Sequence, residues 1–240
     1  MIFGPPNHVN PLGKGLRAFS AVPAHEKIFK VTNAAKFLAA AGTTYSIPKL
    51  HGLPEVIVAG RANVGKSTLL NAVLGRRDLV HTSSKPGRTQ SLNFYRVGPT
   101  FGPGKLVVVD APGYGARGRP EWGEIFDYYI DHREQLRRIY ILLNAKHGLN
   151  EMDRMMLESL NAKTHANAGT RFSLQAIVTK VDAIPLEDVK PTLAKIRQGI
   201  WEAAPLCLPA IVTTAAKHPY IGIDAVRKSI VEACGLQPKV

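Results

Sequence analysis

The sequence predicts an α/β fold with a doubly wound, mostly parallel sheet of about six strands and one antiparallel edge strand. Short apolar segments alternate with amphipathic ones over most of the chain, as strands and helices do in such folds. The run 139–143 is hydrophobic at every position, which is typical of a parallel strand that helices cover on both faces. The apolar segment 55–59 leads directly into a glycine-rich turn and a helix, which favours a strand, loop and helix unit.

The remaining elements follow from the same patterns. A helix is expected over about 29–41, ending at Gly42. Residues 91–97 alternate like a strand, and the short connection 98–104 makes the next strand, 105–109, antiparallel to it. Further helices are expected at 67–74, 121–137, 151–162, 187–203 and 223–233, and further strands at 55–59, 139–143, 173–178 and 208–213.

Composition bounds the organisation of the chain and its partners. The 240 residues suffice for one domain at 29–240, preceded by a flexible extension at 1–28 that is rich in Pro, Gly and Asn. The 31 Lys and Arg against 18 Asp and Glu give a net charge of +13, which indicates a polyanionic partner such as nucleic acid or an anionic membrane. A basic surface without a specific target is the alternative. No apolar run reaches the ~18 residues of a membrane-spanning helix, so we expect no transmembrane segment.

Residues 60–67, with the sequence GRANVGKS, form a complete P-loop between the expected strand and helix. The glycines let backbone amides surround phosphate oxygens, and the helix N-terminus adds positive potential. Lys66 is expected to bridge the β- and γ-phosphates of a nucleotide, and the Ser67 hydroxyl to ligate Mg²⁺. A chance glycine-rich turn is the alternative, but spacing and context both match the motif. The residues expected to contact the nucleotide here are Gly60, Asn63, Val64, Gly65, Lys66, Ser67 and Thr68.

Two further loops make a guanine nucleotide the expected ligand. Thr179, Lys180 and Asp182 follow an apolar strand in the order TKVD. The Asp182 carboxylate is expected to accept hydrogen bonds from N1–H and the exocyclic amine of guanine, a donor pair that adenine lacks. Asp110 and Gly113 follow another strand; Asp110 is expected to hold Mg²⁺ through water, and the Gly113 amide to meet the γ-phosphate. Taken singly, these loops read as a solvated strand end and an ordinary turn, but their order after the P-loop favours a nucleotide site.

Four sequence stretches carry a family resemblance. They are GRANVGKSTLLN, SSKPGRTQSLNFY (83–95), VDAPGYG (109–115) and TKVD. Together they resemble the EngB-type ribosome-assembly GTPases of the translation-factor-related class, over about residues 36–234. The resemblance implies a P-loop GTPase fold, or G domain, with switch II at 113–120. It also implies that Thr89 is the switch I threonine that binds Mg²⁺ and the γ-phosphate, and that Thr214 and Ala215 belong to the last guanine-binding loop.

Two residues bear on the GTP hydrolysis that this resemblance implies. Tyr114 stands where Ras-like proteins have the glutamine that orients water, so intrinsic turnover is expected to be slow. Asn63 stands where potassium-dependent relatives hold K⁺ against the phosphates, which makes K⁺ a candidate cofactor besides Mg²⁺. The alternative is that Asn63 only tolerates a strained loop conformation. The residues expected to act in hydrolysis are therefore Lys66, Asn63, Thr89 and Gly113.

The resemblance implies as partners GTP, GDP and a large ribosomal subunit precursor with its rRNA, and we expect a monomer. Basic residues near the implied switches either couple rRNA contact to nucleotide state or form a solvated face. They are Arg76, Arg77, Lys85, Arg88, Arg117 and Arg119. Two functions stay open: a slow GTPase that switches ribosome assembly, and a nucleotide-gated RNA or protein binding module with negligible hydrolysis. The insert 98–104 and the lack of acidic residues in 1–25 favour a mitochondrial matrix protein, with the bacterial cytoplasm as the alternative.

Overall fold

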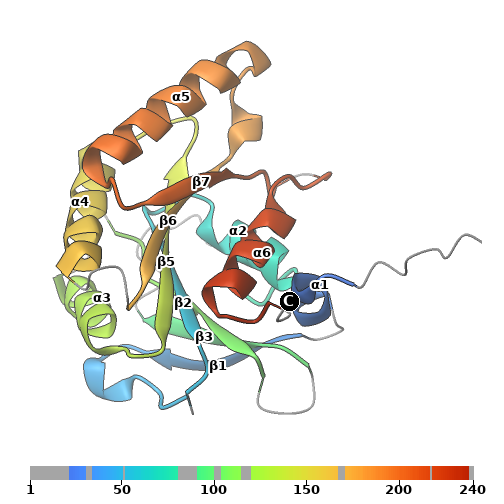
Figure 1. The fold of residues 1–240 in the computed structure, drawn as a ribbon, viewed down its shortest axis with the longest axis vertical. Helices are drawn as coiled ribbons and strands as arrows, with labels where there is room; N and C mark the ends of the chain where they lie inside the picture. Colours follow the sequence, from blue (N-terminus) through green and yellow to red (C-terminus); the bar gives the residue numbers. More distant parts are fainter. Residues whose placement is uncertain are drawn as a thin grey trace, which may run out of the picture.

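The computed structural model describes residues 22–30, 34–50, 52–80, 91–99, 104–114, 120–166, 171–216 and 218–237. Figure 1 shows the arrangement of the elements in this part of the chain. In chain order they are α1 (Ala24–Phe29), β1 (Ala35–Ala41), η1 (Thr44–Ser46), β2 (Glu55–Gly60), α2 (Lys66–Leu74), β3 (Leu92–Val97), β4 (Leu106–Asp110), α3 (Pro120–His132), β5 (Leu136–Asn144), α4 (Glu151–Ala166), β6 (Ser173–Thr179), η2 (Val181–Ala183), α5 (Leu186–Ala203), β7 (Leu208–Val212) and α6 (Ile223–Ala233).

The described strands form one sheet of seven strands in the order β1-β3-β4-β2-β5-β6-β7. The pairs β2–β4, β2–β5, β5–β6 and β6–β7 are parallel. Strand β3 runs antiparallel to both of its neighbours, β4 and β1. The doubly wound, mostly parallel α/β fold is confirmed, and so is the antiparallel pairing of the strands around residues 98–104.

The prediction of a helix over 29–41 is wrong. The chain instead forms the short helix α1 and then the edge strand β1, whose residues from Ala35 to Ala41 pair with β3. Alanine, lysine and leucine favour a helix locally, but β3 has a free edge that this segment completes, and such tertiary pairing overrides propensity. The sheet therefore has seven strands rather than about six, and β3 is not at its edge.

The helix expected over 121–137 is also too long, because α3 ends at His132 and β5 begins at Leu136. A buried ion pair fixes this turn. Arg133 Nη2 lies 2.6 Å from Glu55 Oε1, and the Tyr129 hydroxyl donates to Glu55 Oε2 at 2.6 Å. Glu55 is the first residue of β2 and is fully buried, so the pair ties the end of α3 to the amino-terminal end of the central strand.

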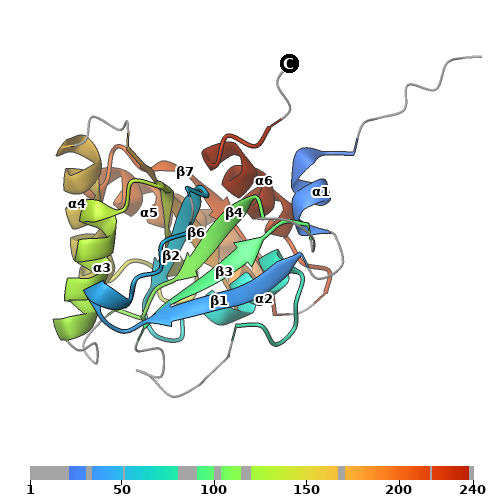
Figure 2. The same cartoon turned by 90° about the horizontal axis from the view of Figure 1, so that it is seen from below.

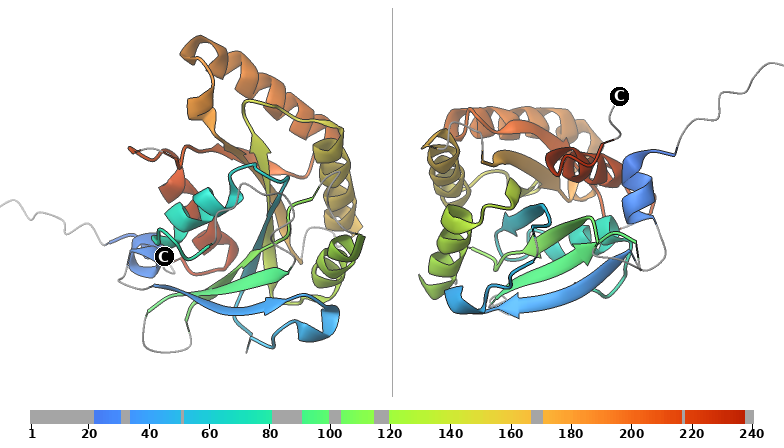
Figure 3. Two further views of the ribbon diagram at one scale, coloured as in Figure 1. Left: turned by 180° about the vertical axis from the view of Figure 1, so that it is seen from behind. Right: turned by 60° about the horizontal axis from the view of Figure 1, so that its bottom comes forward.

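Helices cover both faces of the sheet, as Figures 1 and 2 show. Helices α3, α4 and α5 lie on one face, and α1, α2 and α6 lie on the other, which the two views of Figure 3 also show. Side chains alternate along the central strand: Ile57 and Ala59 pack with the first group of helices, and Val56 and Val58 pack with the second. This two-sided burial is the reason for the continuous apolar runs in the sequence.

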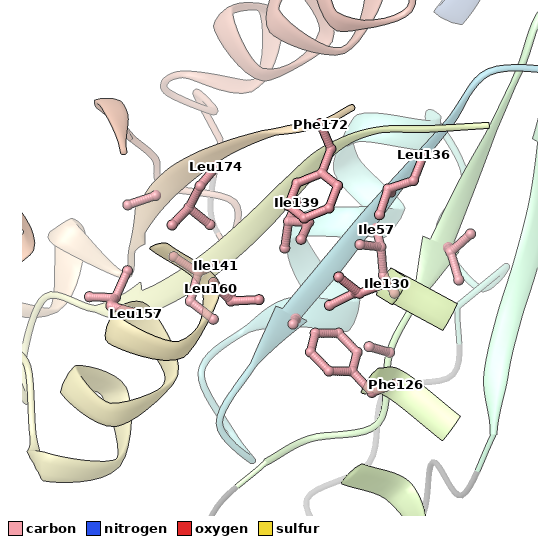
Figure 4. Close-up of a cluster of buried hydrophobic side chains, with 14 of the residues drawn as sticks. Ile57, Phe126, Ile130, Leu136, Ile139, Ile141, Leu157, Leu160, Phe172 and Leu174 are labelled. Carbon is pink, nitrogen blue, oxygen red and sulfur yellow. The ribbon is translucent and has the colours of Figure 1, made fainter. Parts of the chain in front are cut away.

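Figure 4 shows the core on the α3 and α4 face. Phe126 from α3 and Leu160 from α4 pack there with Ile57 and Ile139 of the central strands. The opposite core includes Ile28 and Phe29 of α1, so the packed structure already includes residue 28. The two cores hold the sheet rigid and fix the positions of the loops that follow its strands.

Candidate functional site

The loops that follow β2, β4, β6 and β7 meet at one edge of the sheet, because these strands are parallel. Ligands of open α/β sheets bind at the carboxyl ends of the strands. The residues predicted to bind a nucleotide follow these strands, and those of them that the structure describes gather at this edge. Thr89 lies outside the described residues, as do Lys85, Arg88, Arg117 and Arg119.

The loop after β2 is tightly curled. Asn63 has φ 62° and Gly65 has φ 103°, both in the left-handed region. A Cβ on Gly60 would lie 2.8 Å from Val64 Cγ1 and 2.9 Å from Leu142 Cβ, so only glycine fits there. Helix α2 begins at Lys66, directly after this turn. Backbone amides at a turn and a helix N-terminus make this loop suited to bind phosphate.

Lys66 and Asp110, which the sequence assigns to the phosphates and to Mg²⁺, form an ion pair. Val58 of β2 pairs with Asp110 of β4, and this register brings the ends of the two strands together. Both side chains are buried, with Lys66 8% and Asp110 1% exposed. Their pairing keeps each charge neutralised where water is largely excluded.

The TKVD loop is tied to the P-loop. The Thr179 hydroxyl donates to the Val64 carbonyl at 2.6 Å, and Lys180 Nζ donates to the Asn63 carbonyl at 2.8 Å. Lys180 has φ 57°, which turns the chain so that Asp182 follows in the short helix η2, with its side chain exposed. The arrangement leaves the Asp182 carboxylate accessible to a ligand beside the P-loop.

The last of these loops follows β7. Thr214 pairs with Ile221 through both backbone amides, each donating at 3.1 Å, so the Thr214 amide is already engaged. A pocket of ≈ 840 Å³ lies between this loop, the end of α2 and the start of α6. Its lining residues include Thr68 and Ala215, which the sequence assigns to the nucleotide, and none of the P-loop residues 60–67.

The loop after β4 lies against the P-loop. A Cβ on Gly113 would be 3.2 Å from the Ala62 amide nitrogen, and the Tyr114 amide donates to the Gly60 carbonyl at 3.3 Å. Gly113, predicted to meet the γ-phosphate, is therefore beside the phosphate-binding loop.

Sequence reasoning missed a cluster that involves Arg61, Tyr114 and Asp153. Arg61 Nε lies 3.0 Å from Asp153 Oδ1, and the Tyr114 hydroxyl donates to the same oxygen at 2.9 Å. Asp153 is in the first turn of α4, where an acidic residue needs no further explanation, so no sequence signal pointed to it.

Within the described part of the chain, no three His, Cys, Asp or Glu side chains are grouped as a metal site. No described helix combines the length and the apolar character needed to cross a membrane.

A P-loop on the central strand, an aspartate on the neighbouring strand and a TKVD loop two strands away define the class of P-loop GTPases. Residues 55–176 match the family model described as "50S ribosome-binding GTPase". The chain is 35% identical over 187 residues to "Probable GTP-binding protein EngB" of Rhodospirillum rubrum, with 75% of this chain and 76% of that protein covered. It is 33% identical over 204 residues to the protein of that name from Rhizobium johnstonii, with 79% and 90% covered. The chain belongs to the EngB family of GTP-binding proteins and is a GTPase.

Solved structures agree on the fold. Era from Aquifex aeolicus bound to GDP and AlF4⁻ superimposes with a TM-score of 0.56 at 21% identity, over 78% of this chain and 58% of that chain. A structure described as a probable GTP-binding protein engB has a TM-score of 0.50 at 20% identity, over 75% of this chain and 98% of that chain. These likenesses confirm the fold, while the family model and the EngB relatives confirm the family resemblance found in the sequence.

Proposed function

We propose that this GTPase binds GTP with Mg²⁺ at the P-loop edge of the sheet, hydrolyses it slowly, and thereby switches its affinity for a large ribosomal subunit precursor. The observation that carries the proposal is the buried ion pair between Lys66 and Asp110. A phosphate-binding lysine and a magnesium-binding aspartate must lie within reach of one another if both are to act on one nucleotide.

The residues present suit Mg²⁺, which prefers oxygen ligands. The Ser67 hydroxyl and the Asp110 carboxylate would hold the ion, the latter through water, and Thr89 would complete the site. With a nucleotide bound, Lys66 would pair with the β- and γ-phosphates in place of Asp110, which would leave the Asp110 carboxylate available to hold the ion. When bound, Mg²⁺ neutralises charge that develops on the phosphates during hydrolysis.

Guanine is read by the other loops. Asp182 accepts from N1–H and the exocyclic amine, and the Lys180 stem lies over the base. A Cβ on Gly65 would come within 3.3 Å of Lys180 Cε, so this glycine leaves room for the lysine to lie across the P-loop. Because the Thr214 amide already donates a hydrogen bond to the Ile221 carbonyl, we assign the Ala215 amide to guanine O6.

A large ribosomal subunit precursor, with its rRNA, is the proposed partner. The description of the matching family model and the net charge of +13 support it. Basic side chains that neutralise RNA phosphates provide affinity without reading sequence, which suits a chain with this excess of Lys and Arg.

Single-turnover phosphate release with and without large ribosomal subunits tests the proposal. Release should be slow for the protein alone and faster with large subunits, while small subunits, as a control, should leave it unchanged. Slow release that neither particle changes would show that the protein hydrolyses GTP independently of the ribosome, which would contradict the proposed link to large subunits.

A nucleotide-gated binding module with negligible hydrolysis is the second candidate, and Tyr114 favours it. Its side chain is hydrogen bonded to Asp153 and does not replace the glutamine that orients water in Ras-like proteins. In this case GTP stabilises the docking form, and no phosphate appears in the single-turnover assay even with subunits present.

K⁺ remains a proposed second cofactor at Asn63, whose side chain is exposed beside the phosphate loop. The positive φ of Asn63 equally supports the role of loop former. We also propose a mitochondrial matrix location, which rests on the insert 98–104 and the lack of acidic residues in 1–25. Import into isolated mitochondria tests it, and lack of import would favour the bacterial cytoplasm. Sedimentation equilibrium checks the proposed monomer.

A further inference from the structure

We propose that Asp153 is a positioning residue that joins the P-loop to the start of switch II and so sets the preference of the site for GTP over GDP. The inference rests on the proposed GTP site and on the expectation from the sequence that the Gly113 amide meets the γ-phosphate. It concerns a residue of α4 that is not assigned to the nucleotide by any motif in the sequence.

Asp153 is held firmly by its own helix. Its amide donates to Asn150 Oδ1 at 3.0 Å, and its Oδ2 accepts from the Asn150 amide at 3.2 Å. This reciprocal pair caps α4, which packs on the sheet through buried residues such as Leu157 and Leu160. The carboxylate is therefore a fixed point of the fold and not part of a mobile loop.

The other carboxylate oxygen, Oδ1, accepts from two loops of the nucleotide site. Arg61 of the P-loop donates at 3.0 Å, and the Tyr114 hydroxyl donates at 2.9 Å. Asp153 is fully buried, and a buried carboxylate is stable only while its partners remain in place. Burial and the neighbouring carboxylate raise the pKa of Tyr114, so the phenol stays protonated and keeps donating.

The contact acts on Gly113 because Tyr114 is the next residue. Arg61 and Tyr114 also lie side by side in a parallel backbone bridge, so the two residues are linked through the main chain as well as through the Asp153 carboxylate. With Tyr114 fixed, Gly113 stays beside the Ala62 amide. Its amide is then in place before the γ-phosphate arrives, and GTP binding does not have to order it.

The loss of this contact should affect the affinities for GTP and GDP differently. GDP lacks the phosphate that Gly113 meets, so release of Tyr114 leaves GDP binding nearly unchanged. Tyr114→Phe removes a hydrogen bond to a carboxylate, which corresponds to a factor of about ten or more. We expect the affinity for a non-hydrolysable GTP analogue to fall on the order of tenfold, and the affinity for GDP by less than about twofold.

Asp153→Asn and the double variant test whether the two residues act through each other. Asp153→Asn should lower the ratio of GTP-analogue to GDP affinity as Tyr114→Phe does. Adding Tyr114→Phe to it should then change the ratio less than it does in the wild type, because the hydrogen bond has already lost its charged acceptor.

Tyr129→Phe is a matched control. Its hydroxyl also donates to a buried carboxylate that is paired with an arginine, Glu55 with Arg133, but at the opposite end of β2. This variant should lower the melting temperature and keep the wild-type ratio.

The measurement is equilibrium binding of both nucleotides to all variants by isothermal titration calorimetry. An unchanged ratio in Tyr114→Phe, an equal loss for both nucleotides, or additive effects in the double variant would each overturn the inference. If the wild type itself fails to bind the GTP analogue, the proposed function fails instead.

Discussion

Removing the charge of Lys66 should destabilise the protein in the absence of nucleotide, because Asp110 would then be buried without its cation. The change is Lys66→Met, which keeps an apolar stem of similar length and removes the ammonium group. Lys66 is 8% and Asp110 1% exposed, so water offers the carboxylate little compensation.

The magnitude follows from this burial. Breaking a buried ion pair by removing one partner costs about 3–5 kcal/mol. The pair lies at a ligand-binding edge where loops can adjust, so we take the lower end, about 3 kcal/mol. For a domain of this size, 1 kcal/mol corresponds to a shift in melting temperature of about 2–4 °C, which gives a decrease of roughly 6–12 °C.

Thermal unfolding followed by circular dichroism, without nucleotide or Mg²⁺, measures the shift. The matched control is the double variant Lys66→Met with Asp110→Asn, which removes the orphaned charge and should regain most of the stability. An unchanged melting temperature in Lys66→Met would refute the reasoning, and so would a double variant as unstable as the single one.

Three further predictions follow from the site and the core. Asp182→Asn should lower GTP affinity roughly tenfold to a hundredfold and shift preference toward xanthine nucleotides, because one charged acceptor is lost; competition against a fluorescent GTP analogue measures it, and an unchanged order of preference would contradict the assignment. GTP hydrolysis should be faster in KCl than in NaCl at equal ionic strength, and Asn63→Ala should abolish the difference; no cation effect in the wild type would leave Asn63 as a loop former. Burial raises the pKa of Cys207 to about 11 and that of Cys234 to about 12, so at pH 8 iodoacetamide should label both thiols much more slowly in native than in unfolded protein; rapid native labelling would show that they are accessible.

The sequence predicted the phosphate-binding unit well because its signals are local. The strand β2 is apolar from Val56 to Ala59, Gly65 marks the turn, and α2 begins within one residue of the expected position. Strand β1 was missed because its signal is not local. Its alanine-rich sequence favours a helix, and only pairing with β3, more than fifty residues later in the chain, makes it a strand.

In the site, too, local motifs could be predicted from the sequence, whereas contacts between distant segments could not. Lys66, Asp110 and Lys180 stand in recognisable motifs, and the structure brings them to one edge of the sheet. Their contacts with one another depend on strand register and loop conformation, which single motifs do not encode. Asp153 carries no motif, since an acidic residue in the first turn of a helix is common, and only the packing of α4 against the P-loop gives it a role.

Co-sedimentation with large ribosomal subunits tests the central claim most directly, since it asks whether the nucleotide state controls binding to the partner. We expect the wild-type protein to sediment with large subunits in the presence of a non-hydrolysable GTP analogue, and to remain in the supernatant with GDP. In the bound state, affinity should fall on the order of tenfold or more between 50 and 200 mM salt, because a handful of phosphate contacts release counterions. Equal sedimentation with both nucleotides would show a basic protein that adheres without switching, and absence from the pellet in both would contradict the ribosomal partner.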